Sequence, residues 1–313
     1  MIPVQHTINT PYMVGPVHCY SLEVAGELVL FDTGPPTADA QQYLRENLDL
    51  SSLKYVLITH CHVDHCGLLG WLERETDATF YLPLHDHQKV ARKTEYQQLM
   101  AELLRQVGFD DAFLERFQRR VSDGTIFPQL PENYQIIEEG LPDQLGINAV
   151  ACPGHSQSDL VLTGDDWAVT GDVLLQDIFQ TPMLDIDLEK GGRFQNYRAY
   201  CGSLEKLQRL SGKVILPGHR ETVNSVTECL LFYVNKLLER AFHMRQIPEK
   251  MSAAQVIRSL PNYCEDDPII NYLKVSEIVF FRDFLDDPQL LREALSKMDL
   301  LSPVEELFSR VTS

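Results

Sequence analysis

Thr59-His60-Cys61-His62-Val63-Asp64-His65-Cys66-Gly67 is the stretch that decides both the fold and the chemistry. It follows the continuous apolar run KYVLIT at 54–59, which predicts a strand buried on both faces. Histidine and aspartate are the ligands that hydrolytic zinc and iron sites use. On an extended segment alternate side chains point the same way, so His60 and His62 should face one ion. Asp64 and His65 lie further round the turn, where a helix begins, and can reach a second ion.

Three later loops each supply one more ligand-type side chain at the end of an apolar strand. His155 follows a strand at 147–151, Asp172 ends a strand at 167–171, and His219 follows KVILP at 213–217. A glycine precedes each of the three. Loops at strand ends converge on one edge of a sheet, so we expect the complete set to meet at one place. A single histidine after a strand would not by itself indicate a metal site.

The remaining pattern is that of an α/β protein. The other strands predicted from short apolar runs lie at 17–24, 27–32, 78–82, 134–138 and 159–163. The helices predicted between the strands lie at 38–48, 67–75 and 194–211. The first two strands meet at Ala25-Gly26, which predicts a hairpin turn.

Two helical regions are added to this alternation. Residues 86–131 form a predicted helical insertion in a catalytic domain at 1–224, and two interpretations of it stay open, a helix packed on the core or a lid over the active site. Residues 225–313 are helical in pattern, and Ser225 and Glu228 have the spacing of a capping box at the start of this extension.

The ordered set of ligand-type residues resembles the metallo-β-lactamase superfamily over residues 10–222. That resemblance implies an αββα sandwich, here with an added C-terminal helical region, and two divalent ions, with zinc expected first and iron or manganese as alternatives. It also implies how the ligands are shared. One ion would be bound by His60, His62 and His155, the other by Asp64, His65 and His219, with Asp172 bridging.

Other residues near the motif receive different expectations. Asp32 resembles the structural aspartate of the family, which orients ligands through hydrogen bonds. Cys61 should point away from the ions, and Cys66 begins a departure from the family's DHxGG pattern, since Cys66-Gly67-Leu68 lacks the second glycine. His85 and His87 form a second HxH without a following DH, which favours a capping or surface role. His6, His18 and His243 have no supporting partners in the sequence.

Composition limits the partners of the chain. A formal charge of −18 disfavours nucleic acid and anionic membranes as partners and leaves a small-molecule substrate. Seven cysteines without paired spacing do not form a disulfide framework. No signal peptide or membrane span is evident, so we expect a cytoplasmic protein, and a homodimer stays open.

The resemblance implies hydrolysis by a metal-bridging hydroxide, with Asp64 as a catalytic residue that orients the nucleophile or shuttles its proton. The helical extension favours the glyoxalase II-like, thioesterase-like branch, and therefore an acyl-CoA or acyl-glutathione type of thioester or ester. An apolar acyl pocket could be lined by Phe109, Phe113, Phe117 and Phe179. The alternatives are a lactonase, a phosphodiesterase, a mono-iron persulfide dioxygenase, or a regulatory protein with low turnover.

Overall fold

Side chains alternate along the strands between two apolar layers, and this alternation dictates the architecture. In β3 (Glu27–Phe31), Val29 and Phe31 pack in one apolar cluster while Leu30 packs in another. In β8 (Leu160–Thr163), Leu162 packs in the same cluster as Phe31, and Val161 packs on the opposite side. The computed structural model describes residues 1–122, 129–260, 263 and 267–313.

The first sheet has six strands in the order β1-β2-β3-β4-β5-β6. Besides β3 its strands are β1 (Val4–Ile8), β2 (Val17–Val24), β4 (Leu53–Leu57), β5 (Thr79–Leu82) and β6 (Gln135–Ile136). The pairs β1–β2 and β2–β3 are antiparallel, and the remaining pairs are parallel. The predicted hairpin turn is confirmed, because Ala25 and Gly26 both have positive φ, 53° and 81°. Strand β1 was not predicted.

The second sheet has four strands in the order β10-β9-β8-β7. Besides β8 its strands are β7 (Asn148–Ala151), β9 (Trp167–Gly171) and β10 (Val214–Pro217). Only β9 and β10 run parallel to each other within this sheet. Each of these strands was predicted from the sequence to within about two residues.

Helices cover the outer faces of both sheets. The helices that come first along the chain are α1 (Ala38–Asn47), α2 (Val63–Cys66), α3 (Leu69–Glu75), α4 (Leu84–Ala91), α5 (Lys93–Gln106) and α6 (Asp111–Ser122). The later helices are α7 (Asn196–Gln208), α8 (Val226–Met244), α9 (Ala253–Arg258), α10 (Pro268–Asp286), α11 (Gln289–Lys297) and α12 (Glu305–Thr312). Three short 3-10 helices among the described residues are η1 (Ile137–Glu139), η2 (Asp143–Leu145) and η3 (Ser302–Val304).

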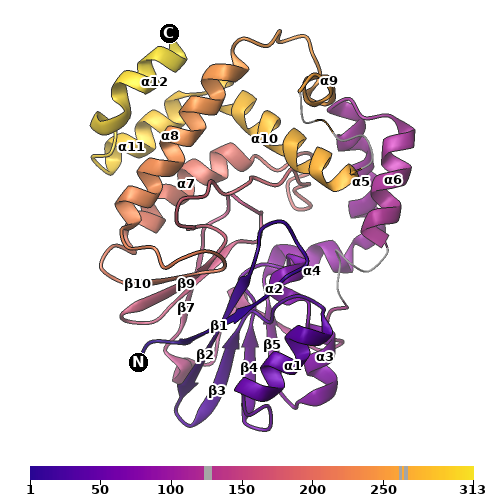
Figure 1. The fold of residues 1–313 in the computed structure, drawn as a ribbon, viewed down its shortest axis with the longest axis vertical. Helices are drawn as coiled ribbons and strands as arrows, with labels where there is room; N and C mark the ends of the chain where they lie inside the picture. Colours follow the sequence, from indigo (N-terminus) through magenta and orange to yellow (C-terminus); the bar gives the residue numbers. More distant parts are fainter. Residues whose placement is uncertain (123–128, 261–262, 264–266) are drawn as a thin grey trace.

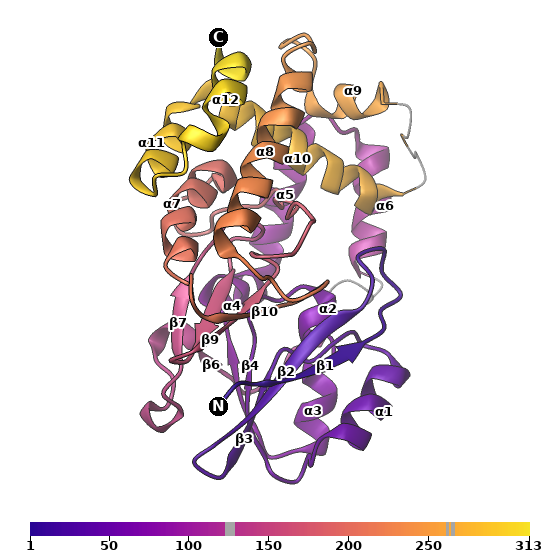
Figure 2. The same ribbon diagram turned by 60° about the vertical axis from the view of Figure 1, so that its left-hand side comes forward.

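The resulting order of layers is helix, sheet, sheet, helix, which confirms the sandwich that the family resemblance implied. Leu44 of α1 and Leu72 of α3 pack on the outer face of the first sheet. Tyr20 and Leu57 of that sheet meet Leu216 of the second sheet in the central layer. Figures 1 and 2 show α1 and α3 beside the first sheet and α7, α8 and the C-terminal helices beyond the second.

The predicted insertion contains α4, α5 and α6, and part of it, 123–128, lies outside the described residues. Helices α5 and α6 share a buried apolar cluster with α9 and α10, in which Leu104 and Phe113 pack with Ile257 and Val275. Figure 1 shows these helices together at one end of the molecule. Opening the insertion as a lid would require breaking this cluster, and its action as a lid stays a prediction.

The C-terminal helices share one core with the second sheet. Ser225 caps α8, and its hydroxyl accepts a hydrogen bond from Glu228 N at 3.3 Å, as the capping spacing predicted. Phe280 and Phe284 of α10 pack against Tyr197 of α7 in edge-on geometry. The extension is therefore joined to the sheet by buried aromatic contacts. Within the described residues no helix is long and apolar enough to cross a membrane.

We expect Phe284→Ala to lower the free energy of unfolding by about 3–5 kcal/mol, because the side chain is fully buried between α7 and α12. Leu260→Ala is the control, since Leu260 is exposed and its truncation should change stability by less than about 0.5 kcal/mol. Urea denaturation of both variants measures the difference. Equal midpoints for the two variants would show that α10 is not part of the cooperative core.

Candidate metal centre

Seven predicted ligand side chains come together at one edge of the two sheets, each from the end of a strand or the short helix after it. They fall into two groups. Within each group the donor atoms all lie within 4.8 Å of one another. The first group is His60, His62, His155 and Asp172, and the second is Asp64, His65 and His219. His62 is the N-cap of α2, and the helix itself carries Asp64 and His65. The alternation inferred from the sequence thus holds at the start of this segment.

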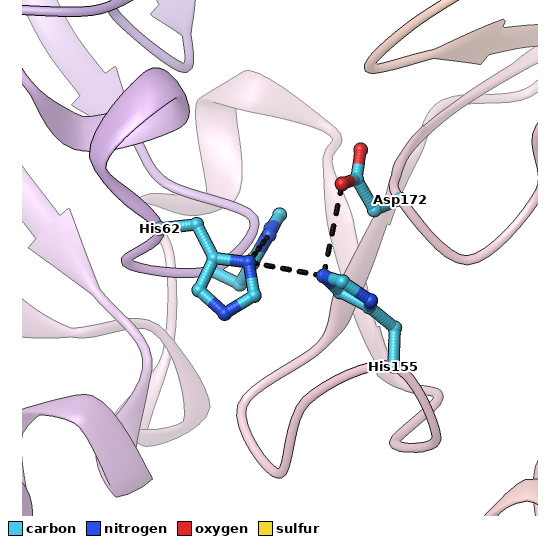
Figure 3. Close-up of side chains that lie close together, drawn as sticks. His62, His155 and Asp172 are labelled. Carbon is cyan, nitrogen blue, oxygen red and sulfur yellow. Dashed lines mark hydrogen bonds and ion pairs between the residues drawn. The ribbon is translucent and has the colours of Figure 1, made fainter. Parts of the chain in front are cut away.

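Three imidazole nitrogens of the first group crowd a single point. His62 Nδ1 lies 2.9 Å from His60 Nε2 and 3.0 Å from His155 Nε2. Asp172 Oδ2 lies 3.6 Å from His155 Nε2. Figure 3 shows His62, His155 and Asp172 pointing toward one another from three separate segments.

The imidazoles of this group are poised to offer lone pairs. Burial, reinforced by the neighbouring His155, lowers the pKa of His62 to about 3. Burial and the adjacent His62 also hold the pKa of His60 well below its ordinary value. Both rings are therefore neutral at pH 7, which is the form that binds a metal.

Asp172 lies between the two groups. Its Oδ1 is 3.3 Å from His65 Nε2 and 3.6 Å from His219 Nε2, while its Oδ2 faces His155. Asp64 Oδ2 lies 3.2 Å from His219 Nε2 and completes the second group. One carboxylate thus presents one oxygen to each group, which is the arrangement of a bridging ligand.

Three atoms that face the second group are buried and make no hydrogen bond of normal geometry among the described residues. They are Nε2 of His65, Nε2 of His219 and, from the first group, Oδ1 of Asp172. Burial alone would lower the pKa of His65, but the carboxylates of Asp172, Asp32 and Asp64 outweigh it and hold the pKa well above its ordinary value. The second group therefore favours a positive charge at its centre, and a cation fits this need.

Asp32 supports both groups from below, where the sequence predicted a structural aspartate. Its Oδ2 accepts hydrogen bonds from His65 Nδ1 at 2.8 Å and from Thr59 Oγ1 at 2.9 Å. Thr59 Oγ1 lies 3.1 Å from His60 Nδ1. Asp32 itself has φ of 56°, so the backbone is held in a seldom used conformation to aim this carboxylate. These bonds leave the Nε2 atoms of His60 and His65 directed at the site.

A buried ion network that the sequence did not reveal holds the loop of His60 and His62. Cys61 N, between the two ligands, donates to Asp86 Oδ2 at 2.8 Å. Lys89 Nζ lies 3.2 Å from Asp86 Oδ1 and 2.8 Å from Asp185 Oδ2. The network therefore ties α4, in the insertion, to this loop and to the segment around Asp185. Of the three charged residues of this network, only Asp86 lies within a motif noted in the sequence, between the two histidines of the second HxH.

The segment before Asp185 in turn orients His155. The ring Nδ1 of His155 lies 2.6 Å from Thr181 O. The backbone carbonyl of His155 accepts a hydrogen bond from Met183 N at 2.7 Å. The proton on Nδ1 leaves Nε2 free for the first group. The long connection between β9 and α7 thus acts as a support for this ligand.

The phenylalanines predicted to line a substrate pocket are divided between two buried clusters. Phe109, Phe113 and Phe117 pack in the cluster shared by the insertion and α10. Phe179 packs in the other, against Phe281. These contacts are those of core residues, and they give the predicted acyl pocket no support.

The other residues near the motif have identifiable partners. His85 Nδ1 lies 3.3 Å from Gln88 Oε1, and His87 Nδ1 lies 2.9 Å from Tyr134 OH, so both act locally around α4. Cys61 packs with the apolar cluster under the first sheet and lies outside both ligand groups. Cys61 and Cys66 are free thiols.

The metallo-β-lactamase superfamily profile matches residues 12–219 of the chain. The protein described as "probable metallo-hydrolase YqjP" of Bacillus subtilis is 30% identical over 270 residues, which cover 81% of this chain and 83% of that protein. A "beta-lactamase-like protein 2 homolog" of Caenorhabditis elegans is 23% identical over 237 residues, which cover 74% of this chain and 64% of that protein.

Two solved structures share the fold. A metallo-β-lactamase family protein from Thermus thermophilus superposes with a TM-score of 0.69 at 20% identity, covering 92% of this chain and 94% of that one. A β-lactamase domain protein from Burkholderia ambifaria gives a TM-score of 0.70, also at 20% identity, with 90% and 86% covered. At these identities the likeness shows the fold alone.

We expect Gly218→Ala to disrupt the second group, because a Cβ at this position would lie 2.6 Å from His65 Cε1 and 2.7 Å from Asp172 Oδ1. Overpacking of this kind costs about 1–3 kcal/mol of stability. Elemental analysis should show a loss of bound metal relative to the unmodified chain. Gly202→Ala is the control, since a Cβ there meets nothing within 4 Å. Full metal content in Gly218→Ala would contradict the close approach.

Proposed function

The chain belongs to the metallo-β-lactamase superfamily, and from this premise we propose that it hydrolyses a thioester or ester of the acyl-CoA or acyl-glutathione type with two divalent metal ions, zinc first. The matched family and the site show a metallo-hydrolase with a cluster of potential metal ligands.

One observation carries the proposal. Seven buried or half-buried imidazole and carboxylate groups converge in two adjoining sets, and the inward nitrogens of His65 and His219 make no hydrogen bond of normal geometry among the described residues. Buried polar atoms are seldom left unpaired in a folded protein. Divalent ions would satisfy them, and a donor set of imidazoles and carboxylates is one that zinc and iron sites use.

The proposed division of ligands follows the two groups. His60, His62 and His155 would hold one ion, Asp64, His65 and His219 the other, and Asp172 would reach both. When bound, such ions supply a water of lowered pKa as the nucleophile. The two sets share the carboxylate of Asp172, so the chain itself keeps them side by side.

Asp64 is the proposed catalytic residue of the chain. Its carboxylate is buried, and His219 Nε2 lies 3.2 Å from Oδ2. Burial opposes the charged form of Asp64, but His65 and His219 outweigh it and hold its pKa below the ordinary value. An ionised Asp64 at neutral pH can accept a hydrogen bond from the attacking water and hold its proton at the carboxylate oxygen.

The choice of a thioester rests on leaving-group chemistry. A thiolate leaves readily near neutral pH, so its departure needs no strong general acid. The neighbouring histidines hold the pKa of Asp64 and of Asp172 below the ordinary value against the effect of burial, so neither carboxyl begins the reaction as an acid, and a thiolate leaving group requires none at that point. Hydrolysis of a lactone or a phosphodiester is the alternative at the same site, and it is tested by assaying these substrates beside the thioesters. A persulfide dioxygenase would instead consume oxygen with a single iron.

We expect the metal-loaded protein to hydrolyse acyl-CoA or acyl-glutathione faster than a lactone or a phosphodiester. His62→Ala should lower kcat/KM for that substrate by about 100-fold or more, because loss even of a group that only orients a ligand costs about 10–100-fold. His85→Ala is the control, since His85 contacts Gln88 on α4 and belongs to neither ligand group. If only a phosphodiester or a lactone were hydrolysed, the proposed substrate would be wrong. Equal activity of His62→Ala and His85→Ala would contradict the proposed site.

Removal of metal should destabilise the fold. The charge of Asp172 opposes the ionised form of the nearby buried Asp64, although His65 and His219 outweigh it, and bound cations would relieve this repulsion. Restoring zinc to 100 times its Kd should raise the free energy of unfolding by about 2.7 kcal/mol. Thermal unfolding before and after chelation measures this, and an unchanged Tm would contradict a bound metal.

A further inference from the structure

The start of β2 runs alongside the loop that carries His219. Val17 and His219 form an isolated β-bridge, and His18 N donates to Gly218 O at 2.7 Å. The ring Nδ1 of His219 lies 2.7 Å from Pro16 O. A proton on Nδ1 leaves the lone pair on Nε2, the atom that faces Asp64 and Asp172. The edge of β2 therefore sets the orientation of this ligand.

Directly after His219 the backbone takes a seldom used conformation. Arg220 has φ of 67°, a left-handed conformation that is unfavourable for an L-residue other than glycine. The carbonyl of Arg220 lies 2.7 Å from His18 Nε2. A conformation of this kind persists only where surrounding contacts fix it, and the ring of His18 supplies one such contact.

The surroundings of His18 fix which nitrogen bears the proton. Its Nδ1 lies 3.2 Å from Gln5 Nε2 and 3.1 Å from Thr7 Oγ1, and both of these groups can donate. An accepting Nδ1 places the proton on Nε2, from which it is donated to Arg220 O. Burial lowers the pKa of His18, so the ring stays neutral and keeps this pattern. Strands β1 and β2 together thus present a fixed donor to the turn.

We propose that His18 is a positioning residue for His219, and that it raises the affinity of the group Asp64, His65 and His219 for its metal ion by holding the Arg220 turn. This inference rests on the proposed function only in requiring that this group binds an ion. His18 touches neither the ion nor the substrate in this account. It acts through the backbone on either side of His219.

A buried histidine that merely stabilises the fold would give a different result, and the chain offers a matched control. His6 lies one strand away on β1 and is as buried as His18. Its Nε2 lies 2.8 Å from Ser21 Oγ, and its ring packs on Tyr43. These contacts lie away from the His219 loop. Loss of His6 therefore removes a buried imidazole without touching the turn.

The test is titration of metal-free protein with Co²⁺, followed by calorimetry and by the visible absorption of the bound ion. The proteins compared are the unmodified chain, His18→Ala, His18→Gln, His6→Ala and His219→Ala. The variant His219→Ala identifies the binding event that belongs to the second group. We expect His18→Ala to weaken that same event by about tenfold and to leave the other unchanged. His18→Gln should recover most of the affinity, because its amide can donate to Arg220 O.

Two results would overturn the inference. One is that His18→Ala binds both ions with the affinities of the unmodified chain. The other is that His18→Ala and His6→Ala weaken both events equally, which indicates a general loss of structure. Failure of the proposed function at this group would appear differently, as a set of binding events that His219→Ala leaves unchanged, and it would remove this inference as well.

Discussion

Burial of unpaired donor atoms is the constraint on which the rest of the structure depends. Lone pairs and negative charges inside a protein are unfavourable unless something positive faces them. Here the crowded imidazoles of one group and the partnerless atoms of the other surround Asp172, whose carboxylate lies between them. Lys89, the cation of the neighbouring ion network, is held by Asp86 and Asp185.

The sandwich serves this constraint by bringing strand ends together. Four strands from the two sheets, β4, β7, β9 and β10, end at one edge, and the short segments that follow them carry the seven groups, so residues from distant parts of the chain meet there. Each ligand is then oriented from behind. Asp32 and Thr59 orient His60 and His65, the β9–α7 connection orients His155, and the start of β2 orients His219. The insertion contributes through Asp86, which links α4 to the loop of the motif.

Much of the fold and the convergence of the ligand set could be predicted from the sequence, because both depend on local signals. Strand alternation, buried apolar runs and a ligand-type residue at each strand end are visible without partners. Strand β1 was missed because its five residues include only two buried side chains. The role of His18 could not be predicted from the sequence, because its hydrogen-bond partner, the carbonyl of Arg220, lies 202 positions away. The phenylalanines were assigned by spacing, and spacing does not distinguish a pocket from a core.

Anomalous X-ray diffraction from crystals of the zinc-loaded protein, collected on both sides of the zinc absorption edge, tests the metal centre most directly. Two anomalous peaks are expected, one among His60, His62 and His155 and one among Asp64, His65 and His219, with Asp172 contacting both. A single peak, or peaks away from these side chains, would contradict the binuclear centre.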